Sequence, residues 1–262
     1  MKALIPAAGL GSRFLPATKA QPKEMLLVVD RPVIQYVVEE GLAAADEVVI
    51  INSRDKKSIE EHFTPNPALE AELRSRGKDK YADKVAHAGN LNVSYVYQDE
   101  PLGLGHAVHC AAEATGNEPF FVLLGDVIVP DNQMLIKMKE VSDAHNGASV
   151  IAVLPVAEDQ VDRFGVIDGV EVSEGVWKVN SLVEKPAVED APSNLAVFGR
   201  YLLTPRVMEL LADAKPGAGN EIQLTDALDA LLKEEEMYAL VIDPEDGYDT
   251  GTIESWLDTN NR

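Results

Sequence analysis

The sequence predicts a three-layer α/β fold, in which helices cover both faces of a mixed, mostly parallel central sheet. Apolar runs that can form buried strands alternate along the chain with amphipathic helical patterns, and this alternation is typical of such sheets. The chain has 262 residues, of which 46% are hydrophobic, which is enough for one large core. We therefore expect a single domain over residues 1–262, with a first part at 1–155 and a second part at 156–262.

Strand-like runs and helical patterns follow one another in the first part. A helix beginning at Pro32, a favoured first helical position, places Ile34, Val37, Val38 and Gly41 on one side. A second helix is expected from Lys56 to Phe63. The expected strands are residues 3–8, 47–51, 93–97, 120–124 and 149–154.

Two later segments depart from this pattern. Residues 68–84 are highly charged, and we interpret them as a solvated helix in a lid-like insertion. After residue 155 the pattern changes to shorter strands, which are expected at 165–168, 176–183 and 195–198. We expect these strands to extend the same sheet and to hold a second substrate.

The strong acidity of the chain restricts its partners. Asp and Glu number 44 against 23 Lys and Arg, which gives a net charge of −21. This charge repels nucleic acid and anionic membranes, so we expect neither as a partner. No stretch approaches the roughly 20 apolar residues that cross a bilayer. A halophilic-type acidic surface also suggests adaptation to high salt, where screening relieves self-repulsion.

The first residues and the single cysteine bear on location and chemistry. The first strand starts just after Lys2, so we interpret this segment as structure, not a signal peptide, and expect a cytoplasmic protein. Cys110 excludes an intramolecular disulfide and is interpreted as a structural thiol on a helix. His106 and His109 have helical spacing but no third ligand nearby, so we do not assign them a metal.

A glycine turn after the first strand indicates a phosphate site. The backbone N–H groups around Gly9 and Gly11 can approach an anion closely, and Arg13 and Lys23 add two cations. A triphosphate is the natural ligand. Phe14 stands where a dinucleotide fingerprint or a Walker A loop needs other residues, so both of those motifs fail. A simple tight turn remains the alternative.

Two aspartates are candidate ligands for Mg²⁺. Asp126 follows an apolar strand and a glycine, at the sheet edge where α/β proteins bind ligands. Asp249 lies on a later strand-to-helix turn and could share the same cation. Both could instead be turn or helix-cap residues, and Asp131 and Asn132 are further cap candidates near Asp126.

Two other segments carry polar groups at strand ends. Glu184 and Lys185 precede Pro186 and would point to opposite faces of an extended strand; a surface ion pair is the alternative. Gln98 precedes a loop in which Gly103 and Gly105 would let the backbone approach a flat base. Gln98 can both donate and accept hydrogen bonds, as the edge of a pyrimidine requires. A generic strand-to-helix loop is the other interpretation.

Six segments together resemble a known family in their order and spacing. They are residues 7–25, 101–108, 124–126, 183–186, 199–201 and 221–226. With these segments the chain is similar to bacterial-type UTP–glucose-1-phosphate uridylyltransferases over nearly its whole length. That family has the nucleotide-diphospho-sugar transferase fold, which is Rossmann-like, so the resemblance implies this fold here.

The resemblance implies roles for individual residues. Asp126 and Asp249 would bind Mg²⁺, and no protein nucleophile is required, because glucose-1-phosphate would attack the α-phosphorus of UTP directly. The contacts that it implies are Ala8, Gly9, Gln98 and Gly103 for uridine, Arg13 and Lys23 for the triphosphate, Lys185 for the sugar phosphate, and Gly165, Glu184 and Val197 for glucose.

Two departures from the family pattern keep alternatives open. Val127 stands where a second aspartate is usual, and Asp249-Thr-Gly-Thr-Ile253 is similar to the glucose-1-phosphate thymidylyltransferases. A glucose-1-phosphate thymidylyltransferase, which uses deoxythymidine triphosphate, or another sugar-1-phosphate nucleotidylyltransferase is therefore the alternative. A silent sugar-nucleotide sensor and a Rossmann oxidoreductase are more distant alternatives, and a homo-oligomer is left open. The retained Arg13, Lys23, Asp126, Lys185 and Asp249 argue against the sensor, and Phe14 argues against the oxidoreductase.

Overall fold

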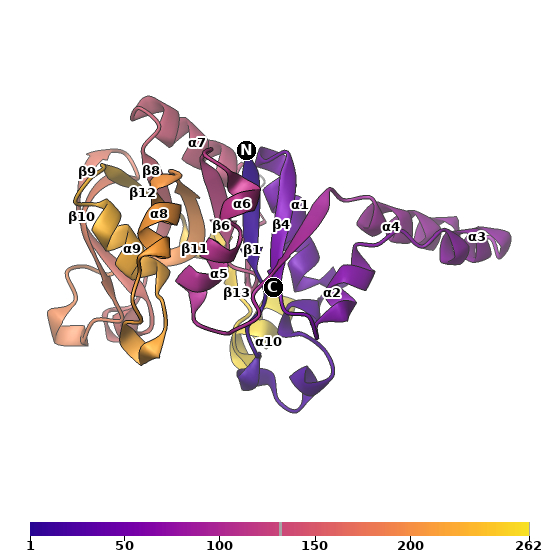
Figure 1. Ribbon diagram of the computed structural model, residues 1–262. Coiled ribbons are helices and arrows are strands. Elements are labelled where there is room, and N and C mark those ends of the chain that lie inside the picture. Colours follow the sequence, from indigo (N-terminus) through magenta and orange to yellow (C-terminus); the bar gives the residue numbers. More distant parts are fainter. Residues whose placement is uncertain (131–132, 262) are drawn as a thin grey trace.

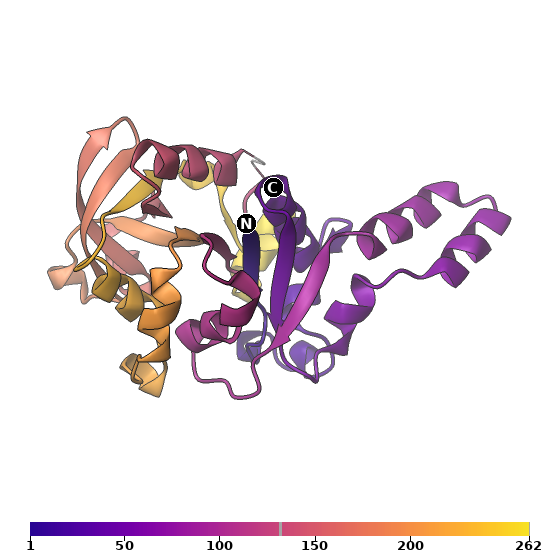
Figure 2. The ribbon, with the colours of Figure 1, turned by 45° about the horizontal axis from the view of Figure 1, so that its top comes forward.

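A nine-stranded sheet with helices on both faces forms the body of the molecule (Figures 1 and 2). The computed structural model describes residues 1–130 and 133–261. Asp131 and Asn132, which we named as cap candidates, lie outside the described residues. No helix in the described part of the chain is long and apolar enough to cross a membrane.

The sheet is mixed, as expected. Its strand order is β5-β4-β1-β6-β11-β8-β12-β10-β9. The first four strands pair in parallel, β12 pairs in parallel with β8, and β10 and β11 run against the rest. The strands are β1 (Lys2–Pro6), β4 (Glu47–Asn52), β5 (Val93–Tyr97), β6 (Phe120–Leu123), β8 (Ser149–Pro155), β9 (Gly165–Ser173), β10 (Val176–Glu184), β11 (Leu195–Leu203) and β12 (Met237–Val241).

Two small two-stranded sheets lie outside the main sheet. One joins β2 (Leu27–Val28) to β3 (Arg31–Pro32), and the other joins β7 (Val127–Ile128) to β13 (Tyr248–Asp249). The second pair matters for the site because it sets Asp249 opposite Val127, the residue after Asp126.

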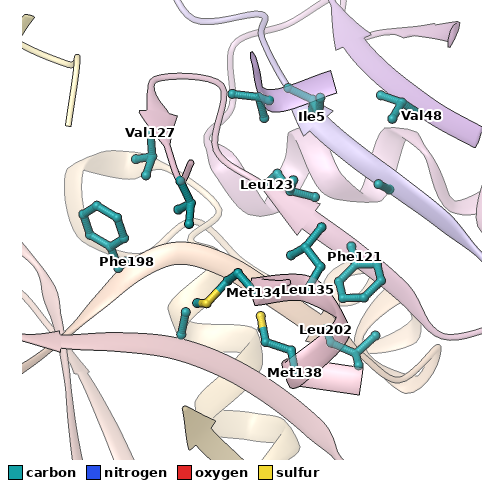
Figure 3. Close-up of a cluster of buried hydrophobic side chains, with 14 of the residues drawn as sticks. Ile5, Val48, Phe121, Leu123, Val127, Met134, Leu135, Met138, Phe198 and Leu202 are labelled. Carbon is teal, nitrogen blue, oxygen red and sulfur yellow. The ribbon is translucent and has the colours of Figure 1, made fainter. Parts of the chain in front are cut away.

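The helices divide between the two faces. Their bounds are α1 (Val33–Ala44), α2 (Lys57–His62), α3 (Pro67–Ser75), α4 (Asp79–Gly89), α5 (Leu104–Cys110), α6 (Ala112–Thr115), α7 (Met134–Ala144), α8 (Arg206–Ala212), α9 (Leu224–Leu231) and α10 (Ile253–Asn261). On one face, α1, α2 and α7 pack apolar residues against the sheet, among them Ile34, Ile59 and Met138. Figure 3 shows part of this core around Phe121 and Leu123. Helices α5, α8 and α9 cover the other face.

Several expected boundaries need correction. The first helix begins at Val33, because Pro32 has an extended ψ of 148° and serves as its N-cap. The strands after residue 155 are not short, since β9, β10 and β11 have nine residues each. The far half of β9 carries exposed side chains, including Val170 and Val172. Its apolar signal is therefore weak, and pairing with β10 supplies the ladder that extends it.

The charged insertion forms a helical hairpin. Helices α3 and α4 pack on each other and project from the β5 edge of the body in both views (Figures 1 and 2). The expectation of a solvated helical segment is confirmed. The expectation of a lid is wrong, because the hairpin extends away from the sheet instead of lying over a strand end.

Candidate active site

Two neighbouring cavities lie beside the ends of the central strands. The first, of about 470 Å³, is lined by the turn after β1 and the loop after β5. The second, of about 430 Å³, is lined by Lys185, Val197 and Asp249, and by residues near the start of β9 and in the middle of β11. Leu124 and Asp126 line both cavities. Asp126 thus lies where two ligands bound side by side would meet.

The first cavity gathers most of the residues expected to bind the nucleotide. Its lining includes Ala8, Gly9, Gly11, Lys23, Gln98 and Gly103. A methyl group at Gly9 would have no protein atom within 4 Å, so this backbone faces open space. Gly11 has a φ of 62°, a conformation that suits glycine. The turn therefore exposes its backbone to a ligand.

The loop that carries Gly103 owes its glycines to protein packing. A methyl group on Gly103 would approach the carbonyl oxygen of Ile222 to 2.7 Å, and one on Gly105 would approach the same atom to 2.9 Å. The Gly105 N–H donates to this oxygen at 2.8 Å. The expected reason for these glycines, close approach to a base, is therefore incomplete, because they allow the loop to dock on the segment before α9.

Gln98 is held in place by its neighbours. Its side chain is buried, and Nε2 lies 3.1 Å from the Gly103 carbonyl oxygen and 2.9 Å from Nδ1 of His106. Nε2 donates in both contacts if His106 carries its proton on Nε2. The structure thus gives His106 a part in orienting Gln98, which the sequence did not suggest. Cys110, on the same helix, is half-buried, and burial raises the pKa of its thiol, as suits a structural residue.

The two candidate metal ligands converge although 123 positions separate them in the sequence. Thr250 ties their segments together, because its N–H and its hydroxyl both donate to the Asp126 carbonyl oxygen, at 2.8 and 2.7 Å. A methyl group on Gly251 would lie 2.9 Å from Asp249 Oδ1 and 3.2 Å from Asp126 Oδ2. The two carboxylates therefore face one small volume.

Partly buried charges of both signs surround this volume, and burial and these charges shift the pKa values of Asp249 and Lys23. Burial raises the pKa of Asp249, and the neighbouring charge of Asp126 acts in the same direction, while the Gly251 N–H lowers it. Lys23 Nζ lies 2.6 Å from Asp126 Oδ2. Burial opposes the charge on Lys23, but the carboxylates of Asp126 and Glu24 outweigh it and raise its pKa. A cation is therefore already paired with Asp126 in this structure.

The donor set suits Mg²⁺. Magnesium prefers carboxylate oxygens and usually keeps water and phosphate oxygens in its remaining positions. Asp126 and Asp249 supply two carboxylates beside both cavities. Within residues 1–130 and 133–261, no cluster of three or more His, Cys, Asp or Glu side chains could form an all-protein metal cage. The residues present fit an ion that a ligand phosphate completes.

The second cavity brings together the residues expected to bind the sugar. A methyl group on Gly165 would lie 3.1 Å from Glu184 Oε2 and 3.7 Å from Val197 Cγ2. The Thr225 hydroxyl donates to Glu184 Oε2 at 2.7 Å. Thr225 belongs to the segment 221–226, which had no assigned role in the sequence, and it fixes one oxygen of Glu184.

Lys185 needs a correction. Its φ is 47°, so the backbone is left-handed and not extended, and its Nζ lies 3.5 Å from Glu184 Oε1. The two side chains therefore approach each other instead of pointing to opposite faces. The Lys185 N–H donates to the Phe164 carbonyl oxygen at 2.9 Å, and Lys185 lines the second cavity, with 59% of its side chain exposed. Lys185 therefore pairs with Glu184 and also faces the second cavity.

Arg13 lines the second cavity, whereas Lys23 lines the first. The Nη1 atom of Arg13 donates to the Gly251 carbonyl oxygen at 3.5 Å. Arg163, which the sequence did not single out, lines the same cavity and lowers the pKa of Asp249 through its charge. The motif Arg163-Phe164-Gly165 could have drawn attention to it, because it directly precedes a predicted site glycine.

A buried ion pair between Glu24 and Lys56 holds the chain at the wall of the first cavity. Glu24 is 1% exposed, and Lys56 Nζ donates to its Oε2 at 3.1 Å and to the Ala7 carbonyl oxygen at 2.7 Å. Burial raises the pKa of Glu24, while the charges of Lys56 and Lys23 lower it. Lys56 thus fixes the end of β1 just before Gly9. A lysine at the start of a helical pattern gives no sequence signal for such a role.

The fold and this pair of cavities define a class of enzyme that joins a nucleoside triphosphate to a second phosphorylated substrate. The chain belongs to the nucleotidyl transferase family, whose model matches residues 2–262. The resemblance read from the sequence is therefore confirmed.

The names of individual relatives specify an activity within this family. The chain is 48% identical to a UTP–glucose-1-phosphate uridylyltransferase of Staphylococcus haemolyticus, over 95% of this chain and 87% of the relative. It is similar to a solved UDP-glucose pyrophosphorylase complexed with UDP-glucose, with 40% identity, a TM-score of 0.88, and coverage of 99% of this chain and 97% of that one. A UTP-bound UGPase from Acinetobacter baumannii has 38% identity, a TM-score of 0.90, and coverage of 99% and 92%.

Proposed function

We propose that this protein is a UTP–glucose-1-phosphate uridylyltransferase, which forms UDP-glucose and pyrophosphate. The observation that carries the proposal is the position of Asp126, which lines both cavities, with Asp249 facing the same volume. An enzyme that joins two phosphorylated substrates needs its charged groups at their junction. Relatives named as uridylyltransferases support UTP and glucose-1-phosphate over the thymidylyltransferase alternative.

The first cavity is proposed to bind UTP. Ala8, Gly9 and Gly103 would contact the base and ribose, and Gln98 would read the edge of uracil from the position that His106 fixes. The backbone around Gly11 and the ammonium of Lys23 would contact the phosphates. Residues 1–155 would thus form the nucleotide-binding part of one domain, and residues 156–262 its sugar-phosphate part.

The second cavity is proposed to bind glucose-1-phosphate. Glu184, which the Thr225 hydroxyl holds through Oε2, would accept hydrogen bonds from sugar hydroxyls. Gly165 and Val197 would contact the ring, and Lys185 would hold the phosphate. Arg13 lines this cavity together with Asp126 and would stabilise negative charge on the reacting phosphates.

The reaction follows from this arrangement. A phosphate oxygen of glucose-1-phosphate would form a bond to the α-phosphorus of UTP, and the bond from that phosphorus to the β-phosphate oxygen would break. Pyrophosphate leaves with the bonding electrons. Asp126 and Asp249 would hold Mg²⁺, which when bound neutralises phosphate charge. The protein's own part is to orient both substrates and to surround the developing charge with Arg13, Lys23 and Lys185.

The test is pyrophosphate release in the presence of Mg²⁺. UTP and deoxythymidine triphosphate are each combined with glucose-1-phosphate and N-acetylglucosamine-1-phosphate, in low salt and in molar KCl. We expect the highest kcat/KM for UTP with glucose-1-phosphate. Preference for another pair would overturn the specificity, and absence of turnover with every pair would favour the sensor. The Asp126→Ala variant should stay folded and lose metal-dependent turnover, whereas unfolding would indicate a structural cap.

A further inference from the structure

Arg200 is the largest fully buried side chain of the described residues, and the proposed reaction gives it no role. It lies on β11, and its side chain is 0% exposed. A buried guanidinium is costly unless all its donors find partners. The partners of Arg200 therefore indicate what this residue does.

All five N–H donors of Arg200 have acceptors. Nε and Nη2 donate to the two carboxylate oxygens of Glu40, on α1, at 2.8 and 2.7 Å. The other donors reach three backbone carbonyl oxygens: Val127 at 2.7 Å, Gly199 at 3.0 Å and Leu124 at 3.4 Å. A lysine has three donors on one atom and could not reproduce this set.

Two of these carbonyls belong to the residues that bracket the Gly125-Asp126 turn. Leu124 and Val127 close the turn with a backbone hydrogen bond of 3.3 Å, from the Val127 N–H to the Leu124 oxygen. Arg200 binds both ends of the same turn from inside the core. Thr250, which is also buried, binds the Asp126 carbonyl oxygen between these two ends and thereby brings Asp249 to it.

We propose that Arg200, with Glu40, is a positioning residue that fixes the backbone of the Asp126 turn and so sets the separation of the two metal-binding carboxylates. The proposal rests on the proposed function of Asp126 and Asp249. Arg200 does not touch the cavities through its own side chain. It acts through the turn, and Glu40 keeps the guanidinium oriented toward it.

The backbone of β11 next to Arg200 agrees with this role. Gly199 has a φ of 65°, and the pairing of β11 with β8 shifts register between Val197 and Tyr201. This irregularity interrupts the strand next to Arg200. A bulge of this kind re-aims a side chain, and such bulges are frequent beside active sites. Here it accompanies a guanidinium directed at the turn after β6.

The test replaces the ion pair without leaving a lone buried charge. In Arg200→Met/Glu40→Leu both charges are absent, and apolar replacement of an ion pair is often neutral for stability. The Val127 carbonyl oxygen also loses its Arg200 donor, which is the contact that fixes the turn. We expect the double variant to stay folded, to lose about tenfold in Mn²⁺ affinity in the presence of UTP, and to lose about 30-fold or more in kcat, with the UTP dissociation constant within about twofold. Mn²⁺ binding is followed by electron paramagnetic resonance, which needs no turnover.

A matched control uses the neighbouring position on α1. Arg31 pairs with Glu39 at 2.6 Å, and neither side chain lines the two cavities. Arg31→Met/Glu39→Leu should leave Mn²⁺ affinity and kcat within about twofold of wild type. If the Arg200 double variant does not fold, Arg200→Lys, which retains the charge beside Glu40, is measured in its place.

The outcomes separate the two claims. A folded Arg200 variant with wild-type Mn²⁺ affinity overturns the positioning role, whatever its kcat. Equal losses in the control would also overturn it, because they would reflect general loosening of α1. If wild type itself showed no turnover, the proposed function would fail, while the Mn²⁺ measurement would still decide whether Arg200 sets the carboxylates.

Discussion

Lys23 and Asp126 form a contact that a bound ligand would have to change. Their charged atoms are 2.6 Å apart, and both side chains are about a quarter exposed. Mg²⁺ at Asp126 and phosphate at Lys23 would each take one partner of this pair. We infer that the pair neutralises Asp126 before ligands bind and opens when nucleotide and metal arrive together.

Lys23→Met tests this inference through two opposite effects. Without the ammonium, Asp126 is free, so Mn²⁺ affinity in the absence of nucleotide should rise about fivefold, which corresponds to about 1 kcal/mol for a partly exposed pair. UTP affinity should fall by about 2 kcal/mol, since a charged hydrogen bond to phosphate is lost. Titration with Mn²⁺ and with UTP separately measures both. Weaker Mn²⁺ binding in the variant would contradict the inference.

Gly9 offers a test of where the nucleotide binds. Its φ lies outside the left-handed region, and an added methyl group would meet no protein atom within 4 Å. Gly9→Ala should therefore leave the fold intact and raise its free energy of unfolding by about 0.5 kcal/mol, because alanine restricts the unfolded chain.

The same methyl group would occupy space that the proposed uridine contact needs. We expect the KM for UTP to rise about tenfold, with the KM for glucose-1-phosphate changed by less than about twofold. Initial-rate measurements with each substrate varied in turn distinguish the two. A change confined to glucose-1-phosphate would place the nucleotide elsewhere.

At the scale of elements, the hairpin of α3 and α4 makes few ties to the body. Lys84 pairs with Asp30 at 2.8 Å and His87 with Glu39 at 2.9 Å, and these side chains are largely exposed except Glu39. Exposed ion pairs contribute little to stability. The hairpin thus lies outside the site in both its position and its contacts.

Excision of the hairpin should therefore leave catalysis intact. In a variant with residues 67–88 replaced by a short Gly-Ser linker, we expect kcat and both KM values within about twofold of wild type and a Tm lower by no more than about 5 °C. Activity assays and thermal unfolding measure these quantities. A tenfold loss of kcat in a folded variant would restore the idea that this segment covers the site.

The sequence predicts those elements whose signal is local. Most strands up to residue 155 stand out because they are apolar and buried on both faces, as Val48–Ile51 of β4 illustrate. The edge strand β5 is only half-buried. The exposed end of β9 has no such signal. The direction of the α3–α4 hairpin also escaped prediction, since amphipathicity shows that a helix is solvated but not where it points.

The residues of the candidate site also differ in whether a local sequence pattern predicts them. Gly9, Lys23, Asp126 and Asp249 could be predicted as candidates because Gly9, Asp126 and Asp249 come after apolar strands and Lys23 comes soon after the first glycine turn, in patterns that bind phosphate or metal. Lys56, Arg163 and Arg200 could not be assigned roles, because each acts through partners far away in the sequence, such as Glu40 for Arg200. Only the folded chain brings these partners together.

At the scale of the whole molecule, acidity dominates. With 44 acidic and 23 basic residues, one-to-one pairing would leave 44 − 23 = 21 carboxylates without a cation. Surface ion pairs such as Arg206 with Glu234 contribute at most about 1 kcal/mol each. Repulsion among the excess carboxylates extends over a Debye length, which is about 30 Å at 0.01 M salt and about 3 Å at 1 M.

Salt weakens both the ion pairs and this repulsion, and the excess of like charge makes the repulsion the larger effect. We therefore expect Tm to rise by about 5–10 °C between 0.01 M and 1 M KCl, which corresponds to a relief of about 2–3 kcal/mol in a chain of this size. Because the Debye length shortens most at low concentration, most of the rise should occur below about 0.3 M. Sucrose at matched osmolality controls for general exclusion of solutes from the protein surface. A Tm that stays constant or falls in KCl would show that local ion pairs outweigh the net charge, and the acidic surface would then not be an adaptation to salt.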